Sequence, residues 1–339
     1  MSSIHDVARY CGVSTATVSR ALRGLPNVSP RTRHLVQSAA AELGYVASAS
    51  AAGLSSGRNR AVAIVVPSMG RWFYTEVVEG SARVLRAEGY DTFLVSLEVG
   101  ASGRGRLFSN SLLRKRADAV IALGIDFKAD ERRELRSLSL PAVVVGGPVA
   151  GVRSVGVDDV VATRLALDHL LALGHRRIAH IGGEDEWGMD YTVALVRRRE
   201  WRTVVEGRGT AVPAAWFGSG GFLMPQAKQV ALSLLAGPDR PTAVFAGSDE
   251  MAFGVLLAAR DLGLRVPEDL SVIGIDDHSW SASFGLTTVR QDPKAQGGHA
   301  ARIVLDELGG LPVHGLVHHS PIELVVRATT APPSATGGA

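Results

Sequence analysis

Short apolar runs rich in β-branched residues alternate with longer helical segments from residue 61 onward, and this alternation restricts the fold more than any other feature. The runs expected to form strands are Val62–Val66, Thr92–Val95, Ala119–Leu123, Ala142–Val145, Ile178–Ile181, Ala243–Ala246 and Val272–Ile275. Helices are expected between them, over Thr75–Glu88, Val160–Leu173 and Asp249–Leu262, each followed by a glycine. Continuously apolar strands that alternate with helices indicate parallel sheets covered on both faces. So many strands predict an α/β body of two doubly wound, parallel-sheet lobes, which bind ligands beyond the carboxyl ends of their strands.

The first 45 residues have the pattern of an all-α helix-turn-helix head. Apolar residues at helical spacing predict two short helices over residues 4–22. Gly12 falls between them, where a left-handed backbone angle is needed, and Ser14 is placed to cap the second helix. A third helix is expected to follow Ser29 and to stop at Gly44. In a helix-turn-helix the second helix lies in the major groove of DNA.

The charge distribution supports a head that binds nucleic acid. The chain has 36 basic and 33 acidic residues, yet residues 1–60 hold seven arginines and only two acidic residues. A compact basic head on a slightly acidic body is the distribution expected of a module that binds a polyanion. Scattered surface arginines are the alternative, and the helix-turn-helix pattern in the same segment weighs against it.

The composition excludes several other classes of protein. With 46% hydrophobic and 20% charged residues the chain resembles an ordinary globular protein, and its apolar runs are too short to span a membrane. No secretory signal is visible, and the single cysteine, Cys11, suits a reducing cytoplasm and is expected to pack as a small hydrophobe. The histidines lack the spacing of a zinc site, and no phosphate-binding glycine loop or catalytic nucleophile motif is present. We therefore expect no metal, no cofactor and no enzymatic activity.

Residues 46–60, which join head and body, are mostly small. The simplest interpretation is a flexible linker. Residues 47–54 can also form two helical turns, but so short a helix is not stable alone in water. We therefore expect this segment to fold only against another surface, with Leu54 as the residue that needs a partner. The tail, residues 331–339, is expected to be disordered.

Several motifs, taken in chain order, make the sequence similar to the lactose/galactose repressor family of bacterial transcription regulators. Those of the head are Asp6-Val-Ala, Gly12-Val-Ser, Thr17-Val-Ser-Arg, Val28-Ser, Thr32-Arg and Ala41-Glu-Leu-Gly-Tyr. Those of the body are His169-Leu, Leu173-Gly-His-Arg-Arg-Ile, Arg240-Pro-Thr-Ala, Asp249-Glu-Met-Ala-Phe-Gly, Val266-Pro-Glu-Asp-Leu-Ser-Val-Ile-Gly-Ile-Asp-Asp and Leu286-Thr-Thr. The resemblance covers roughly residues 3–330.

This resemblance implies a sequence-specific transcriptional regulator, in the first place a repressor, that binds a pseudo-palindromic operator as a homodimer. A small-molecule effector, expected to be a sugar or sugar derivative, binds between the lobes and controls operator affinity. The implied parts are a head (1–45), a hinge helix (46–60), an N-terminal lobe (61–161 and 291–320) and a C-terminal lobe (162–290 and 321–330). The absence of a C-terminal leucine heptad favours a dimer over a tetramer. The expected location is the cytoplasm, with the nucleoid when DNA is bound.

The resemblance also assigns DNA contacts. Thr15, Ala16 and Arg20 match positions that face base edges, where arginine can donate two hydrogen bonds to guanine. The residues assigned to phosphates or to the DNA interface in general are Ser14, Thr17, Ser19, Asn27, Ser29 and Tyr45. Helix packing is the alternative for Thr17. Leu54 matches a hinge leucine that wedges into the minor groove, and a passive linker residue is the alternative.

Effector contacts are assigned in the same way. Arg197, four residues before Trp201, matches an arginine that binds the effector, although an arginine run on an exposed helix would look the same. Asp276 matches an acid that accepts effector hydroxyls, and Trp216 a cleft aromatic that can stack on a sugar. The other residues assigned to the cleft are Ser68, Arg71, Phe73, Tyr74 and Ser248.

The chain departs from the family pattern at the cleft mouth and in the hinge. Arg71-Trp72 replaces a common Asn-Pro, and Ser248 replaces the usual Asn. An extra cation and an extra ring predict an anionic or bulkier effector, such as a sugar phosphate or a glycoside. In the hinge, Ala47-Ser48 and Ala52 keep the helix propensity but lose polar contacts to DNA.

Other functions remain open at the level of sequence. A solute-binding protein of similar fold is disfavoured by the missing secretory signal and by the basic head. A sugar-converting enzyme of similar fold is disfavoured by the lack of a catalytic constellation. A regulator whose cleft binds nothing is a third alternative.

Overall fold

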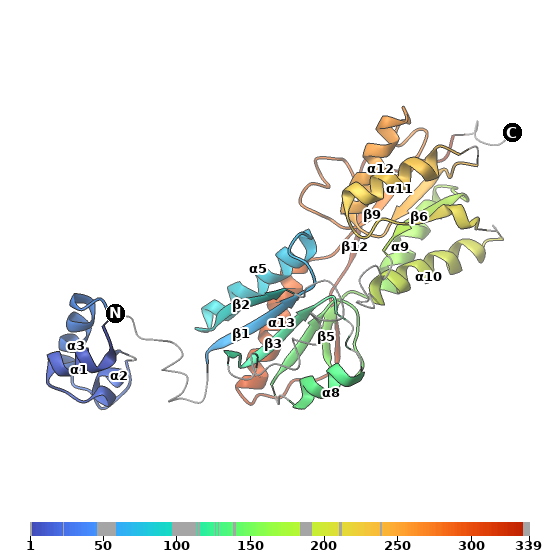
Figure 1. Ribbon diagram of the computed structural model, residues 1–339. Helices are drawn as coiled ribbons and strands as arrows, with labels where there is room; N and C mark the ends of the chain where they lie inside the picture. Colours follow the sequence, from blue (N-terminus) through green and yellow to red (C-terminus); the bar gives the residue numbers. More distant parts are fainter. Residues whose placement is uncertain are drawn as a thin grey trace. The chain divides into compact units, whose positions relative to one another are not determined.

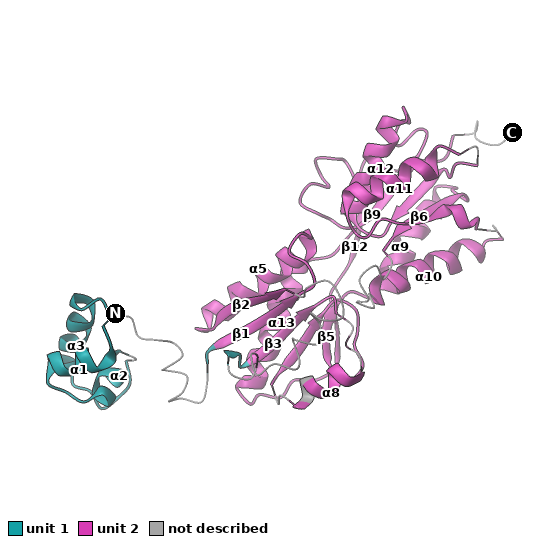
Figure 2. Cartoon of the chain, viewed as in Figure 1, with its two compact units in different colours: residues 1–60, 115–118 teal, residues 61–114, 119–339 magenta. Residues whose placement is uncertain are grey.

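The computed structural model describes most of the chain (Figure 1). The described residues are 2–22, 24–45, 59–96, 113, 116–125, 127, 129–137, 140–183, 192–209, 212–237 and 239–334. They belong to two compact units, residues 1–60 with 115–118, and residues 61–114 with 119–339 (Figure 2). Residues 46–58, and with them the predicted hinge helix and Leu54, lie outside the described residues.

The first unit contains the three predicted helices of the head, α1 (Ile4–Cys11), α2 (Thr15–Leu22) and α3 (Pro30–Glu42). Gly12 ends α1 with a left-handed φ of 66°, and Ser14 Oγ accepts a hydrogen bond from the backbone nitrogen of Thr17 at 3.1 Å. Ser29 caps α3 in the same way, with Thr32 as the donor. One valine from each helix is fully buried in the core of the head: Val7, Val18 and Val36. The helix-turn-helix prediction is confirmed.

The N-terminal lobe of the second unit is built on a six-stranded sheet in which the described pairings are all parallel. Its order is β11-β5-β4-β3-β1-β2, with β1 (Ala61–Val66), β2 (Asp91–Ser96), β3 (Ala119–Leu123), β4 (Ala142–Val145), β5 (Arg153–Gly156) and β11 (Val317–His319). The helices of this lobe are α5 (Trp72–Ala87), α8 (Ala129–Ser137) and α13 (Pro293–Leu308). Every residue of β3 is buried, as expected of a central strand covered on both faces.

Two glycines allow α5 and α13 to touch. A Cβ atom at Gly80 would lie 2.0 Å from the carbonyl oxygen of Lys294, and one at Gly297 would lie 2.1 Å from that of Val77. Ser81 Oγ lies between the helices and donates to Val77 and Gly297 carbonyl oxygens, at 2.9 and 3.0 Å. The first turns of α13 are therefore held against α5 by direct backbone contact.

The C-terminal lobe contains the second six-stranded sheet, in the order β12-β10-β9-β8-β6-β7. Its strands are β6 (Ile178–Gly182), β7 (Phe217–Ser219), β8 (Ala243–Ala246), β9 (Ser271–Asp276), β10 (Thr287–Arg290) and β12 (Glu323–Val325). Only β12, at one edge, is antiparallel among the described pairings. The remaining elements are α9 (Asp159–Ala172), α10 (Thr192–Glu206), the 3-10 helix η1 (Ala214–Trp216), α11 (Met224–Leu235) and α12 (Asp249–Asp261).

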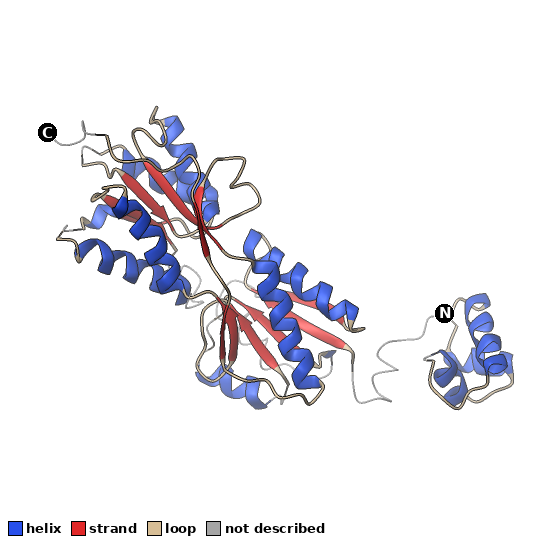
Figure 3. Ribbon diagram, turned by 180° about the vertical axis from the view of Figure 1, so that it is seen from behind, coloured by secondary structure: helices blue, strands red, loops and turns tan. Residues whose placement is uncertain are grey.

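The chain passes between the two sheets three times: after β5, after β10 and after β11. Figure 3 shows the strands of both sheets flanked by helices, with the crossing segments between them. Strands therefore end at the gap between the lobes from both sides. The predicted fold class, a helix-turn-helix head with two doubly wound lobes, is confirmed.

Two features differ from expectation. No prediction covers β5, β7, β10, β11 and β12, because these strands of three or four residues lack a continuous apolar run, unlike the four-residue β4. The prediction of a disordered tail is wrong at its start. The backbone nitrogen of Ala331 donates to Ser271 Oγ at 3.0 Å, and its carbonyl oxygen accepts from His175 Nε2 at 2.9 Å. These two side chains of the C-terminal lobe hold the start of the tail in place. Residues 335–339 lie outside the described residues.

Candidate functional site

The exposed face of α2 carries the residues predicted to read DNA bases. Ala16 and Arg20 are exposed, whereas Val18 and Ala21 on the other side of the helix are buried in the head. Residues four apart share one helix face, so the methyl group of Ala16 and the guanidinium of Arg20 lie on the same surface. Thr15, at the start of the helix, is half-buried. This face offers an apolar contact beside a bidentate hydrogen-bond donor.

The small polar residues predicted to contact phosphates lie around that face, and several also hold the helices in place. Ser14 and Ser29 are N-caps, and Thr17 Oγ1 lies 2.9 Å from Ser14 Oγ. Asn27 is exposed with a left-handed φ of 66° in the turn before α3. The other two residues of this set, Ser19 and Tyr45, are half-buried. The alternative role for Thr17, helix packing, is thus compatible with its position.

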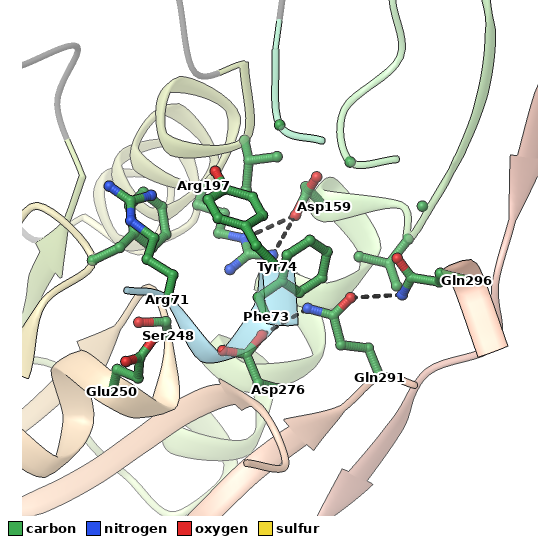
Figure 4. Close-up of a pocket in the computed structure, with 16 residues that line it drawn as sticks. Arg71, Phe73, Tyr74, Asp159, Arg197, Ser248, Glu250, Asp276, Gln291 and Gln296 are labelled. Atoms are coloured by element: carbon green, nitrogen blue, oxygen red, sulfur yellow. Dashed lines mark hydrogen bonds and ion pairs between the residues drawn. The ribbon is translucent and has the colours of Figure 1, made fainter. Parts of the chain in front are cut away.

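A pocket lies between the two lobes of the second unit, beyond the carboxyl ends of the parallel strands (Figure 4). The space between its lining residues that holds no protein atoms is about 690 Å³, which includes open solvent. Its lining residues are Arg71, Phe73, Tyr74, Gly124, Gly146, Gly156, Val157, Asp159, Val193, Arg197, Phe222, Ser248, Glu250, Asp276, Gln291 and Gln296. This is where doubly wound folds bind ligands.

Arg197 lies on α10, on the side of the pocket formed by the C-terminal lobe, and is 4% exposed. Its guanidinium contacts Asp159 Oδ1 through Nε at 2.8 Å and Nη2 at 2.7 Å, and its Nη1 donates to the carbonyl oxygen of Gly247. One turn further along α10, Trp201 is fully buried, and its indole donates to the carbonyl oxygen of Ile178 at 3.1 Å. The packing of Trp201 thus anchors α10, and Asp159 both neutralises and orients the arginine.

Two glutamines and one aspartate form a chain of hydrogen bonds across the gap between the lobes. Gln291 Nε2 donates to Asp276 Oδ1 at 2.7 Å, and Gln296 Nε2 donates to Gln291 Oε1 at 2.8 Å. Asp276 ends β9 in the C-terminal lobe, and Gln296 lies on α13 in the N-terminal lobe. In Figure 4 the three side chains follow one another along one wall of the pocket.

The carboxyl groups beside this chain have shifted pKa values. Burial, with the nearby carboxyl group of Asp249, raises the pKa of Asp276 to about 8, so Asp276 holds a proton at neutral pH. Burial also raises the pKa of Asp249 to about 6, although hydrogen bonds from Ser281 and Thr288 lower it. Those two hydroxyls donate to Asp249 at 2.6 Å each, and the carboxyl group thereby braces the loop that follows Asp276.

Arg71, at the mouth of the pocket, precedes α5 in the N-terminal lobe. Its guanidinium lies 5.8 Å from the ring centroid of Tyr74 on α5 and also reaches the C-terminal lobe. Its Nη2 donates to the carbonyl oxygen of Gly221 at 3.0 Å, and its guanidinium lies 5.2 Å from the ring centroid of Phe222. Burial raises the pKa of Glu250, and the charge of Arg71 opposes that rise. Arg71 is 9% exposed, and the carboxyl group of Glu250 lies near enough to feel its charge.

Trp72, the extra ring predicted at the cleft mouth, does not line the pocket. Its ring packs on the His278 ring at a centroid distance of 4.6 Å. His278 is buried, and its Nδ1 accepts from the backbone nitrogen of Trp280, so the imidazole offers Trp72 a fixed face. The extra ring predicted at the cleft mouth therefore packs on His278 and is not part of the pocket lining.

The structure brings together six of the eight residues predicted to bind the effector: Arg71, Phe73, Tyr74, Arg197, Ser248 and Asp276. Ser68 is exposed outside the pocket, where its Oγ accepts from Gly70. Trp216 is also placed elsewhere, and its assignment is corrected. It precedes β7, at the opposite end of the strands from the pocket, and its indole donates to the carbonyl oxygen of Asp239 at 3.1 Å.

Several lining residues have no counterpart in the sequence predictions: Asp159, Phe222, Gln291, Gln296 and the glycines at 124, 146 and 156. The glycines had a signal, because each ends or follows a predicted or neighbouring strand. Gly156 also lets two chain segments touch, since a Cβ there would lie 2.3 Å from the carbonyl oxygen of Gly146. Gln291 and Gln296 had none, because only the crossing after β10 turns them toward the gap.

Within the described residues no group of three or more His, Cys, Asp or Glu side chains is arranged to hold a metal ion. Among the same residues no helix is both long and apolar enough to cross a lipid bilayer.

Comparisons with known proteins agree with this architecture. Residues 3–48 match the family described as bacterial regulatory proteins, lacI family, and residues 167–330 match the periplasmic binding protein-like domain. The transcriptional regulator MalR of Streptomyces coelicolor is 35% identical over 96% of this chain and 96% of its own. The transcriptional repressor CytR of Escherichia coli K12 is 30% identical over 97% of this chain and 96% of its own.

Two solved structures are similar over nearly the whole length. The lac repressor dimer bound to operator and the anti-inducer ONPF has a TM-score of 0.85 at 26% identity, over 97% of this chain and 99% of that one. A complex of the transcriptional regulator CelR with cellobiose has a TM-score of 0.71 at 28% identity, over 97% of this chain and 100% of that one. The helix-turn-helix head, the two lobes and these relatives lead to one conclusion: the chain belongs to the LacI family of bacterial DNA-binding transcription regulators.

Proposed function

We propose that this protein is a repressor whose affinity for a pseudo-palindromic operator is controlled by an uncharged sugar or glycoside bound between its lobes. The observation that carries the proposal is a pocket with lining residues from both lobes, in a chain that also has a DNA-reading head. A ligand that contacts both lobes binds their arrangements with different affinity, and such differential binding can change how two heads meet DNA. Operator binding would place the protein in the cytoplasm with the nucleoid.

The charges of the pocket favour an uncharged effector. Arg197 is paired with Asp159, and Arg71 has Glu250 beside it. Asp276 holds a proton at neutral pH, because its pKa is raised to about 8. Each cation of the lining therefore has a carboxyl group nearby, and a phosphate group would gain little there. Of the two ligand classes that the sequence suggests, the glycoside fits better than the sugar phosphate.

The shape and donors of the pocket favour a polyhydroxylated ring. Phe73, Tyr74 and Phe222 supply aromatic surface, which packs well on the apolar face of a sugar. Asp276 and Arg197 supply polar groups fixed by their neighbours. The cellobiose complex of the similar regulator CelR supports the same class of ligand.

On the DNA side, we assign base contacts to Thr15, Ala16 and Arg20. The exposed face shared by Ala16 and Arg20 supports this assignment. Phosphate and general DNA contacts are assigned to Ser14, Thr17, Ser19, Asn27, Ser29 and Tyr45, and the minor-groove wedge to Leu54.

We further propose that the protein is a homodimer that uses an aromatic surface of the C-terminal lobe. Trp280 is 56% exposed and Phe284 is 43% exposed, and both pack on the buried ring of Phe253, with centroid distances of 6.3 and 4.7 Å. Large exposed rings gathered in this way are typical of protein interfaces. The similar lac repressor, solved as a dimer, supports a second copy of the chain as the partner.

The test selects DNA from a random pool with the purified protein, with and without cellobiose, maltose, glucose and glucose 6-phosphate. We expect a palindromic site, bound with an affinity that falls by about 0.9 log units per tenfold rise in salt for each phosphate neutralised. An uncharged sugar should also raise the midpoint of thermal unfolding, whereas glucose 6-phosphate should not. Equal binding to scrambled DNA would refute specific repression, and stabilisation by the phosphate alone would refute the uncharged effector.

A further inference from the structure

Gln296 occupies a position on the pocket wall that the fold holds firmly. It lies in the first turns of α13, is 1% exposed and lines the pocket. The start of α13 is fixed independently of this side chain. Asp292 caps the helix through a bond from the backbone nitrogen of Ala295 at 2.8 Å, and Gly297 is in backbone contact with α5. The carboxamide of Gln296 is therefore not needed to start the helix.

The hydrogen-bond chain sets which end of the Gln296 carboxamide is left over. In the structure Asp276 Oδ1 accepts from Gln291 Nε2 at 2.7 Å. Gln291 Oε1 then accepts, and the donor must be Gln296 Nε2. The side-chain oxygen of Gln296 is thus the last group of this hydrogen-bond series. Among the described residues it has no hydrogen-bond partner, although it is buried.

A buried acceptor without a donor costs free energy, and the cost is recovered when a donor reaches it. Gln296 borders the cavity, so the missing donor can come from a molecule in the pocket. The other polar groups of the lining differ in this respect. Arg197 and Asp159 bind each other, and Ser248 Oγ accepts from the backbone of α12.

We propose that Gln296 is a specificity-determining residue of the effector site, whose carboxamide oxygen accepts a hydrogen bond from one hydroxyl group of the bound sugar. This inference rests on the proposed function, because it deepens the ligand class of the same pocket. It makes the site selective for a hydroxyl at one ring position. A sugar that carries hydrogen or a methoxy group at that position leaves the acceptor unpaired and is rejected.

The test compares Gln296→Met with the wild-type full-length protein. Methionine has a similar length and shape but no acceptor oxygen. Gln229→Met is the matched control, since it makes the same chemical change at an exposed position on α11, outside the pocket. Binding of cellobiose, maltose and glucose is measured by thermal shift and by calorimetry. For the sugar that binds, we expect Gln296→Met to weaken affinity at least tenfold and Gln229→Met to leave it unchanged.

Monodeoxy and mono-O-methyl analogues of the bound sugar then separate recognition from a structural effect. One analogue should bind the wild type weakly and lose nothing further in Gln296→Met, because both changes remove the same hydrogen bond. If Gln296→Met does not fold, a crystal structure of the wild-type complex decides the matter. There Gln296 Oε1 should lie within hydrogen-bond distance of a sugar hydroxyl.

The remaining outcomes overturn the proposal and can be told apart. Equal affinity of wild type and Gln296→Met for a sugar would show that Gln296 does not select the effector, while the proposed function stands. If the affinity lost through Gln296→Met adds to the affinity lost through the analogue for every analogue, Gln296 has a structural role. If the wild type binds none of the three sugars, the proposed effector class fails, and the role of Gln296 fails with it.

Discussion

At the scale of single residues, the pocket depends on charged groups that are neutralised by neighbours before any ligand arrives. Arg197 is held by Asp159, and Arg71 by the Gly221 carbonyl oxygen with Glu250 nearby. Asp276 is neutralised differently, because burial makes it retain a proton. Each device lets a polar group enter a buried wall without leaving an isolated charge.

Asp276 gives the folded state an unusual dependence on pH. Its pKa is raised from 3.8 to about 8, so between these values the folded protein holds a proton that the unfolded chain releases. The contribution of Asp276 to stability is greatest below pH 4 and falls as the pH rises, by at most about 1.4 kcal/mol per pH unit. Asp276→Asn removes this titration, and we expect its stability relative to wild type to increase from pH 5 to pH 8.

The measurement is denaturant unfolding of both proteins at several pH values. Histidines such as His175 and His180, whose pKa values are lowered by burial, titrate in both proteins and largely cancel in the difference. Parallel stability curves for wild type and Asp276→Asn would contradict the raised pKa.

Arg20 is the residue on which operator selectivity should depend most. We expect Arg20→Ala to weaken binding to the selected operator by about 1–3 kcal/mol, because a bidentate contact to guanine is lost. Arg9→Ala is the control, since Arg9 is also an exposed arginine of the head but lies on α1. Fluorescence anisotropy on operator and on scrambled DNA separates the effects. If Arg20→Ala and Arg9→Ala lose the same affinity for operator and for scrambled DNA, Arg20 contributes only its charge.

At the scale of elements, α13 belongs to the N-terminal lobe and places Gln296 in the wall of the pocket between the lobes. The contact between α13 and α5 requires glycine at positions 80 and 297. A Cβ atom would lie 2.0 Å from a carbonyl oxygen at Gly80 and 2.1 Å from one at Gly297. Gly298 is different, because a Cβ there would meet Val84 Cγ2 at 3.4 Å, an ordinary contact. Neighbouring glycines of one helix thus have different constraints.

This difference predicts opposite effects of one substitution at adjacent positions. Gly297→Ala should destabilise the protein by roughly 1–3 kcal/mol, because the two helices must separate. Gly298→Ala should be neutral or stabilise by up to about 1 kcal/mol through helix propensity. Thermal and denaturant unfolding measure both. Equal effects of Gly297→Ala and Gly298→Ala would mean that α5 and α13 are not in backbone contact.

At the scale of the whole molecule, the aromatic surface of the C-terminal lobe bears on assembly. Trp280 is 56% exposed and adjoins Phe253 and His278, yet it is not part of the pocket. We expect Trp280→Asp to weaken the homodimer at least tenfold, because a charge would be buried in the interface without a partner. Leu311→Asp is the control, at a position 59% exposed on the other lobe.

Analytical ultracentrifugation over a range of protein concentrations measures this effect. The unfolding temperature of Trp280→Asp monitors the fold. An unchanged dimer in Trp280→Asp, or an equal loss in Leu311→Asp, would exclude this surface as the dimer interface.

The class of fold and the helix-turn-helix head could be predicted from the amino-acid sequence. Helix caps and stops are local, so Gly12, Ser14 and Ser29 could be identified by their spacing alone. The longer strands were also predictable, because a central parallel strand buries both faces and must be continuously apolar. Of the eight residues that the family motifs assign to the effector, six line the pocket, whereas Ser68 and Trp216 lie elsewhere.

The polar groups that meet in the pocket, and their protonation states, depend on how the chain folds and could not be predicted from the sequence. The partner of Arg197 is Asp159, 38 positions earlier, and the partner of Arg71 is Gly221, 150 positions later. No local pattern records such pairings, because they depend on how three crossings of the chain bring the strand ends of two sheets to one gap. The same crossings bury Asp276 and turn Gln291 and Gln296 toward it. Spacing along the chain names the candidate residues, whereas burial and distance in the folded protein set their charge and their free hydrogen-bonding groups.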